Sequence, residues 1–227
     1  MQAVILAGGK GTRLEPLTYT VPKPMVSVCG KPFLQHLLEL LRSCGLTDVL
    51  VLACYLGEQI EDYFGSGSSF GISIRYSYEK TLLGTGGALK NAKDMLDETF
   101  LLFNGDTFLP INYDLLITRF EQSGRTAMVV AYGGPEPIAR NNLKIQNGSV
   151  VAYNQDDVDG MTHLDAGVIA MKREVLKLIA PEYVCSLEEQ VLPRLIEAGE
   201  LVAFETQQRF YDMGSFEGLS TIQKVLI

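Results

Sequence analysis

Two hydrophobic patterns alternate along the first half of the chain. "AVILA" (3–7) is a continuous apolar run, which is typical of a strand buried on both faces. "KPFLQHLLELLRSCG" (31–45) has Pro32 in its first turn, apolar residues three and four apart and Gly45 at its end, so it predicts a helix. The same patterns predict strands at 48–55, 72–79, 99–106 and 126–133, and helices at 57–64, 84–96 and 113–124. This βαβα order predicts an α/β fold with a mainly parallel sheet and helices on both faces.

The pattern changes after residue 133. Asn147-Gly148 lies between two strand-like runs and predicts a β-hairpin within 141–154. A further strand is expected at 164–172. Helices are expected at 186–199 and 215–227, each with a serine at its N-cap. No repeat or low-complexity linker interrupts the chain. We therefore expect one domain over residues 1–227, with a nucleotide-type half (about 1–133) and a mixed half (about 134–227).

The stretch "LAGGKGTRLEPLTYTVPKPM" (6–25) follows the first strand and carries candidate phosphate chemistry. It lacks the GxxxxGK[ST] spacing of a P-loop, and Leu14 stands where the dinucleotide pattern GxGxxG needs its last glycine. Its backbone N–H groups could still wrap a triphosphate, with Arg13 forking onto phosphate oxygens. On the glycines alone, a tight turn with a surface arginine explains the pattern equally well. Lys23 strengthens the functional interpretation because prolines on both sides restrict its backbone.

Two aspartates follow strand-like runs far apart in the sequence. Asp106 ends "LLFNGD", and Asp212 ends the short run "RFYD". Ligands of open α/β sheets bind beyond the carboxyl ends of the strands, so we expect the glycine stretch and Asp106 to meet there. If both carboxylates converge, they would form a magnesium site. Asp212 alone is equally well explained as a turn residue. "LGTGGAL" (83–89) offers close approach to a flat ligand, and we expect its backbone to recognise a base.

Composition and charge exclude several classes of function. The 227 residues carry a formal net charge of −8, which argues against a general nucleic-acid binder. Apolar runs fall short of the ~20 residues that a membrane span requires. The four cysteines form no CxxC pair, so we expect reduced thiols and a cytoplasmic protein. No Ser/His/Asp arrangement or GxSxG elbow supports covalent acyl chemistry.

The motifs "LAGGKGTRLEPLT", "PKPM", "LGTGGAL", "NGD" and "YDMGS" together resemble the sugar-1-phosphate nucleotidyltransferases, collinearly over nearly the whole chain. The closing motif is the weaker one, because Ser215 stands where the family usually has threonine. The resemblance implies a Rossmann-like three-layer α/β/α fold with a mixed, mainly parallel sheet. It also implies the reaction of an NTP with a sugar 1-phosphate to give an NDP-sugar and pyrophosphate. In such an enzyme Arg13 would hold the β- and γ-phosphates, Lys23 the α-phosphate, and Asp106 and Asp212 the cofactor Mg²⁺.

The same resemblance assigns the remaining site residues. The residues expected to contact the nucleotide are Leu6, Ala7, Gly8, Gly9, Gly11, Thr12, Arg13, Lys23, Gly84, Thr85 and Asn104. Those expected to contact sugar hydroxyls are Asn142, Asp165 and Glu188, although each is equally well explained as a cap or surface residue. The family often has a Glu-Lys pair after the hairpin, but "AYNQDD" (152–157) has no lysine, and this departure bears on the sugar more than on the chemistry.

The resemblance also ranks the nucleotide base and the sugar 1-phosphate that such an enzyme would use. "LGTGGAL" is most similar to short guanylyltransferases acting on heptose or mannose 1-phosphate, so GTP is the first expectation. Short uridylyltransferases that use N-acetylmuramate 1-phosphate are the second, and cytidylyl transfer is the third. A non-catalytic nucleotide-sugar-binding homologue is the alternative to an enzyme, although neither basic residue nor carboxylate is missing. We expect a monomer or a homodimer.

Overall fold

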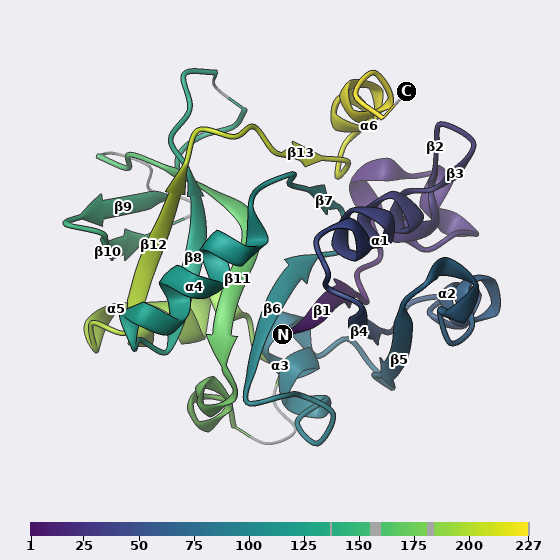
Figure 1. The fold of residues 1–227 in the computed structure, drawn as a ribbon. Helices are drawn as coiled ribbons and strands as arrows, with labels where there is room; N and C mark the ends of the chain where they lie inside the picture. The colour runs from purple at the N-terminus through teal and green to yellow at the C-terminus, as the bar shows by residue number, and fades with distance from the viewer. Residues whose placement is uncertain (137, 155–159, 181–183, 227) are drawn as a thin grey trace.

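A nine-stranded mixed sheet runs through the computed structural model, which describes residues 1–136, 138–154, 160–180 and 184–226 (Figure 1). The strand order is β5-β4-β1-β6-β11-β8-β12-β10-β9. The strands are β1 Gln2–Ala7, β4 Asp48–Ala53, β5 Ser73–Tyr78, β6 Thr99–Asn104, β8 Ala127–Tyr132, β9 Leu143–Gln146, β10 Ser149–Tyr153, β11 Leu164–Lys172 and β12 Leu201–Thr206. Strands β5, β4, β1 and β6 are parallel, whereas β11 runs antiparallel to its neighbours β6 and β8.

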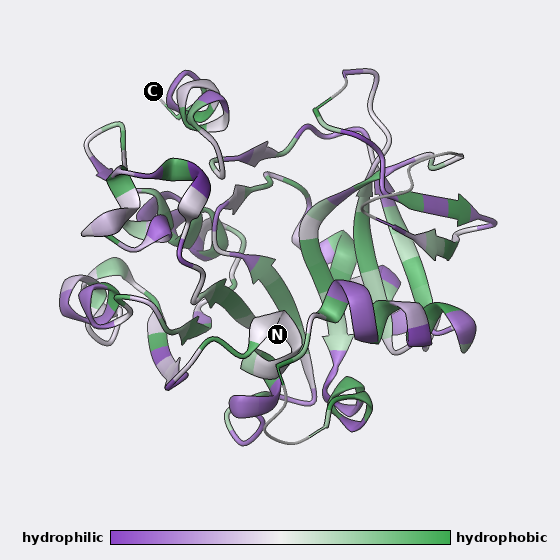
Figure 2. Cartoon of the chain, turned by 180° about the vertical axis from the view of Figure 1, so that it is seen from behind, coloured by the Kyte–Doolittle hydropathy of each residue, from purple (hydrophilic) through white to green (hydrophobic). Residues whose placement is uncertain are grey.

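Helices cover both faces of this sheet. The helices α1 (Phe33–Ser43), α2 (Glu58–Phe64) and α4 (Tyr113–Ser123) share one hydrophobic core, and α3 (Gly84–Asn91) and α5 (Leu192–Glu197) share the other. Strand residues alternate between the two cores, as the period of two requires. Hydrophobic colouring is accordingly concentrated on the central strands (Figure 2). The expected three-layer α/β/α fold with a mixed, mainly parallel sheet is confirmed.

Several element boundaries differ from the sequence prediction. The helix expected at 84–96 ends at Asn91, and the one expected at 186–199 begins as a π-helical turn, Leu187–Val191, before α5. Several elements were not predicted, among them strand β12, the 3₁₀ segment Arg173–Leu178 and the two-residue strands Ser27–Val28, Lys31–Pro32 and Thr107–Phe108. Most of them are too short to show an apolar period. Tertiary packing, not local pattern, therefore sets their conformation.

The local signals with a steric mechanism are confirmed. Asn147 and Gly148 have φ values of 51° and 76°, as the tight hairpin between β9 and β10 requires. Ser186 and Ser215 are N-caps, and their hydroxyls accept hydrogen bonds from Glu189 N at 3.2 Å and Gly218 N at 3.1 Å. All four cysteines are free thiols. In the described part of the chain, no helix has the length and apolar character to cross a membrane.

The C-terminal segment returns to the loop that follows β1. Strand β13 (Tyr211–Asp212) pairs antiparallel with β7 (Thr107–Phe108), and helix α6 (Phe216–Gln223) follows it (Figure 1). Strands β2 (Ser27–Val28) and β3 (Lys31–Pro32) form a small hairpin beside α1. A separate hydrophobic core joins these parts and consists of Leu14, Val26, Val28, Phe33, Met213, Leu219 and Ile222. We call it the closing core, because it ties the chain end to the glycine stretch.

Replacing Ile222 by alanine should loosen the closing core. Its side chain is fully buried, so the change should lower the free energy of unfolding by about 2 kcal/mol in a denaturant titration. Ser220→Ala on the exposed side of the same helix is the matched control and should leave unfolding unchanged. Equal stability of the Ile222 variant and the wild type would show that the closing core does not hold the chain end.

Candidate active site

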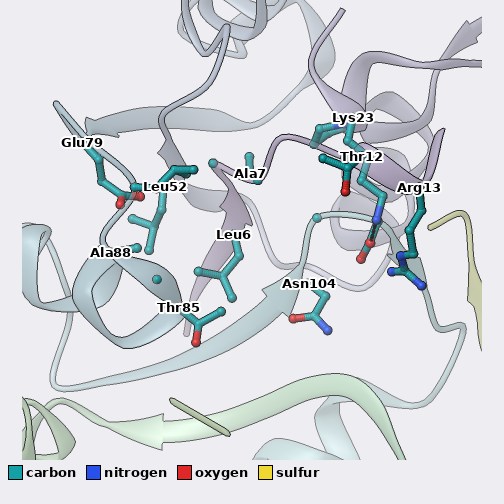
Figure 3. A pocket seen from close by; sticks show the side chains of 18 of the residues that line it. Leu6, Ala7, Thr12, Arg13, Lys23, Leu52, Glu79, Thr85, Ala88 and Asn104 are labelled. Atoms are coloured by element: carbon teal, nitrogen blue, oxygen red, sulfur yellow. Dashed lines mark hydrogen bonds and ion pairs between the residues drawn. The ribbon is translucent and has the colours of Figure 1, made fainter. Parts of the chain in front are cut away.

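A cavity of about 530 Å³ opens at the carboxyl ends of β1 and β6, beside the glycine stretch (Figure 3). All eleven residues expected to contact the nucleotide line it, and so do Asp106 and Glu188. The cavity has two distinct ends. Arg13 and Lys23 lie at one end, and Glu79, Leu52 and Ala88 lie at the other (Figure 3). The glycine stretch and Asp106 therefore do meet beyond the strand ends.

The glycine stretch turns sharply at Gly11. This residue has a φ of +67°, and a Cβ here would lie 2.9 Å from Thr18 Cγ2 and 3.0 Å from Lys23 Cβ. The Gly11 carbonyl accepts hydrogen bonds from Leu14 N at 2.9 Å and from Thr18 Oγ1 at 3.0 Å. Only glycine satisfies both the backbone angle and the space. The turn carries Arg13 into the cavity, and its guanidinium makes no hydrogen bond or ion pair with any described residue.

The prolines around Lys23 act as the sequence predicted. Pro22 is extended at φ −64° and ψ 145°, and a 3₁₀ turn starts directly at Lys23. Val26 N donates to the Lys23 carbonyl at 3.2 Å and closes this turn. The lysine side chain is 13% exposed and forms an ion pair with Asp106 Oδ2. Because the backbone is restrained on both sides, the ammonium group has a fixed direction into the cavity.

Two basic and two acidic side chains converge around Gly214. A Cβ on this glycine would lie 2.7 Å from Arg13 Nη2, 2.7 Å from Asp212 Oδ1 and 3.0 Å from Lys23 Nζ. The pairing of β7 with β13 places Asp212 opposite Thr107, next to Asp106, and Met213 N donates to the Asp106 carbonyl at 3.0 Å. Residues from both ends of the chain thus form one charged cluster.

The pKa of Asp212 reports this crowding. Burial raises it above the ordinary aspartate value, and the charge of Asp106 raises it further. The Gly214 N–H and the charges of Lys23 and Arg13 act in the opposite direction but do not cancel these effects. The two carboxylates therefore share the positive charge of Lys23 and Arg13. Within the described residues, no third Asp, Glu, His or Cys joins them in a cluster that could hold a metal.

We expected the backbone of residues 83–89 to recognise a base, but at the end of the cavity away from Arg13 and Lys23 two of its N–H groups are already paired. The N–H groups of Gly86 and Gly87 both donate to the Cys185 carbonyl, at 2.8 and 3.2 Å, so α3 does not offer them to a ligand. Sequence analysis missed Glu79, which lines the cavity there and is 9% exposed. Leu83 N donates to its Oε2 at 2.8 Å, and burial raises the pKa of the carboxyl. Its position directly after a parallel strand was the available signal, the same signal that identified Asp106.

A smaller cavity of about 170 Å³ adjoins the first. It contains all three residues expected to contact the sugar, Asn142, Asp165 and Glu188, and Asn104 and Glu188 line both cavities. Sequence analysis missed Tyr153, which also lines it. Residues 155–157 of the segment "AYNQDD", where the family's lysine would fall, lie outside the described residues.

Three hydrogen bonds hold Asp165 in this smaller cavity. Its Oδ1 accepts from Gly167 N at 2.8 Å, its Oδ2 accepts from Tyr153 OH at 3.1 Å, and its backbone N donates to Asn142 Oδ1 at 2.8 Å. Burial raises its pKa to about 6, and the charge of Glu188 adds to the effect. The pairing of β11 with β8 is irregular between Asp165 and Ile169, and both residues line the cavity.

Glu188 connects the two cavities through Thr85. Its Oε2 accepts hydrogen bonds from Thr85 Oγ1 at 2.7 Å and Ser186 Oγ at 2.9 Å. The Thr85 hydroxyl in turn accepts from Leu187 N at 2.8 Å. Glu188 lies in the π-helical turn before α5, a distortion that is common at functional sites. The start of α3 and the π-helical turn before α5 are therefore held together where the two cavities join.

Known proteins are similar to this chain in sequence and in structure. The mannose-1-phosphate guanylyltransferase of Mycobacterium tuberculosis is 34% identical over 224 residues, which cover 96% of this chain and 62% of that protein. The UTP–glucose-1-phosphate uridylyltransferase of Synechocystis is 30% identical over 217 residues, which cover 88% and 56%. The chain thus spans about three fifths of the length of these curated relatives. HddC from Yersinia pseudotuberculosis has a similar structure, with a TM-score of 0.87 at 28% identity over 100% of this chain and 99% of that one.

A structure of the same HddC protein complexed with GMP-PN also matches, with a TM-score of 0.87 at 27% identity. The family model described as "Nucleotidyl transferase" matches residues 2–226, which is nearly the whole chain. The chain therefore belongs to the nucleotidyl transferase family.

Proposed function

We propose that the protein transfers a nucleotidyl group from an NTP to a sugar 1-phosphate, giving an NDP-sugar and pyrophosphate. The observation that carries the proposal is the convergence of Arg13, Lys23, Asp106 and Asp212 beside one end of the cavity of about 530 Å³. The names of relatives that act on mannose or glucose 1-phosphate support the acceptor class. In this proposal residues of about 1–133 bind the nucleotide, and residues of about 134–227 supply the sugar contacts.

The side chains would act by position and charge. The Arg13 guanidinium, which has no hydrogen bond or ion pair to a described residue, can bind the β- and γ-phosphates bidentately. Lys23 would leave Asp106 for the α-phosphate and offset the negative charge that develops there during in-line attack by the sugar phosphate. Pyrophosphate leaves toward Arg13. No residue needs to form a covalent intermediate, because the cavity aligns the two phosphates and so lowers the entropic cost of their reaction.

Asp106 and Asp212 would hold Mg²⁺. The pairing of β7 with β13 brings these two residues next to each other, and two neighbouring carboxylates are oxygen ligands that suit a hard divalent cation. When bound, such an ion would neutralise phosphate charge in the reaction. It would also free Lys23 from its ion pair with Asp106.

Glu79 favours guanine as the base. Guanine presents two adjacent donors, N1–H and N2–H₂, whereas uracil presents one donor between two acceptors. A carboxylate accepts hydrogen bonds only, so it matches the guanine edge. Glu79 lies at the opposite end of the cavity from Arg13 and Lys23, where the base of a bound nucleotide would lie (Figure 3). The guanylyltransferase among the relatives and the GMP-PN complex of HddC support the same choice.

The acceptor would lie in the smaller cavity, with heptose or mannose 1-phosphate as our first choice. Asn142, Asp165 and Glu188 supply amide and carboxylate groups that can bind sugar hydroxyls. The alternative is a uridylyltransferase acting on N-acetylmuramate 1-phosphate, and the uridylyltransferase among the relatives supports it. A grid of four NTPs against these sugar phosphates, scored by pyrophosphate release with and without Mg²⁺, distinguishes them. Activity with UTP alone would reject the guanylyl proposal, and tight NDP-sugar binding without any turnover would identify a non-catalytic protein.

Asp106→Asn should reduce pyrophosphate release by about 100-fold or more, because it removes one charge from the proposed metal site while keeping the side-chain shape. Asp212→Asn should have a similar effect. The control is Asp114→Asn on the exposed side of α4, which should retain wild-type activity. Near-normal turnover by Asp106→Asn would refute the metal assignment.

Glu79→Gln should weaken GTP use specifically. Glutamine can still accept the Leu83 N–H bond, but it presents a donor toward guanine in place of an acceptor. We expect kcat/KM for GTP to fall about 10- to 100-fold, while that for UTP stays the same or rises. A parallel loss for both nucleotides would mean that Glu79 supports the cavity wall and does not read the base.

Asp165→Asn should change the pH dependence of stability. The folded-state pKa of about 6 lies above the ordinary value, so the folded protein binds more protons than the unfolded one between about pH 4 and 6. The free energy of unfolding of the wild type should therefore fall as pH rises through this window, relative to the variant. The variant should be more stable at pH 8, by at most about 3 kcal/mol, and the difference should vanish near pH 4. Parallel stability curves from thermal melts would contradict the raised pKa.

A further inference from the structure

A third cavity, of about 620 Å³, lies apart from the other two, and of its lining residues none lines either of them. Its lining residues come from the end of α3, from the 3₁₀ segment Arg173–Leu178 and the residues after it, and from the π-helical turn and α5. Its charged residues are Lys90, Lys177 and Arg194, and Leu178 and Ile179 add apolar surface. We call it the basic cavity.

Positive charge predominates in the lining of the basic cavity, although Lys177 also borders a neighbouring hollow that contains Glu98 and Glu174. No described Asp or Glu lines the basic cavity, and none of its three basic residues forms an ion pair with a described carboxylate. Lys90 Nζ donates to the Leu176 carbonyl at 2.8 Å, and Arg194 Nη1 donates to the Leu178 carbonyl at 3.0 Å. Each keeps further donors, since an ammonium has three N–H groups and a guanidinium five. On a chain of net charge −8, such a local excess of positive charge favours an anionic ligand.

Helix α3 reaches both the basic cavity and the cavity of about 530 Å³, which we call the nucleotide cavity after its proposed function. Helix α3 begins at Gly84 and Thr85, which line the nucleotide cavity, and carries Lys90 into the basic one. Cys185 lines the basic cavity, and its carbonyl accepts the N–H groups of Gly86 and Gly87. Cys185 N also donates to the Leu83 carbonyl at 2.8 Å. A ligand that binds Lys90 of α3 and Arg194 of α5 together would hold α3 against the segment from Cys185 to Arg194.

We propose that the basic cavity is a second anion site, which binds a phosphate-bearing small molecule and is coupled to the nucleotide cavity through α3 and Cys185. The phosphate would contact Lys177, Arg194 and Lys90, and the rest of the ligand would pack on Leu178 and Ile179. A bound ligand stabilises the contacts that fix the start of α3, so it would act on nucleotide binding, and nucleotide would act on it equally. The inference does not depend on which base or sugar the enzyme uses.

Calorimetric titration with pyrophosphate tests the site. Arg13→Gln/Lys23→Gln removes the phosphate contacts of the nucleotide cavity, and we expect one pyrophosphate to bind this variant still. Adding Lys177→Gln and Arg194→Gln should weaken that binding at least about 10-fold. Lys93→Gln, which removes an exposed lysine that does not line the basic cavity, should leave it unchanged. Loss of all binding in Arg13→Gln/Lys23→Gln, or equal binding after the cavity substitutions, would overturn the proposal.

Hydrogen exchange tests the coupling in the same Arg13→Gln/Lys23→Gln background. Pyrophosphate should slow exchange of the Gly86 and Gly87 amides at least about threefold, because their acceptor is Cys185 in the wall of the basic cavity. Adding Lys177→Gln and Arg194→Gln should abolish this slowing. Thermal melts of each variant verify that it is folded. Binding without any change in exchange at these amides would reject the coupling.

Discussion

The structure depends on holding two carboxylates side by side against their mutual repulsion. Asp106 lies near the middle of the chain and Asp212 near its C-terminal end, and burial, with the charge of Asp106 added, raises the pKa of Asp212. The β7–β13 pairing and the closing core offset the cost of this burial with backbone hydrogen bonds and buried apolar surface. Arg13 and Lys23 then balance part of the negative charge. The same contacts that close the chain thereby assemble the charged end of the candidate active site.

The two ends of the nucleotide cavity differ in chemistry, with basic and acidic side chains together at one end and a buried carboxyl group at the other. Restrained backbone places Arg13 and Lys23 at one end, and burial keeps Glu79 at the other (Figure 3). A nucleotide also has two different ends, with anionic phosphates and a base whose edge carries hydrogen-bond donors and acceptors. In the proposed function, the cavity would select the orientation of the nucleotide as well as the class of ligand. A reversed nucleotide would place phosphate beside a carboxylate, which is unfavourable at short range.

The segment from Cys185 to Glu188 connects all three cavities. Cys185 lines the basic cavity, and Glu188 lines the other two. Both residues hold the start of α3, one through its carbonyl and the other through Thr85 Oγ1. Sequence analysis treated this region as an ordinary capped helix and identified only the Ser186 cap and Glu188. A π-helical turn has no distinct sequence period, so its effect on the direction of Glu188 appears only in the folded chain.

The sequence by itself determined the elements that local physics controls. Buried strands, the Asn147-Gly148 turn and the serine caps follow from side-chain period and backbone sterics, and these predictions were right. Tertiary structure decided which distant groups meet. It paired Asp212 with the edge of β7, used the Gly86 and Gly87 amides to hold Cys185, and placed Glu79 in the nucleotide cavity. These outcomes depend on non-local pairing and burial, whose free energies arise only when separate elements pack together.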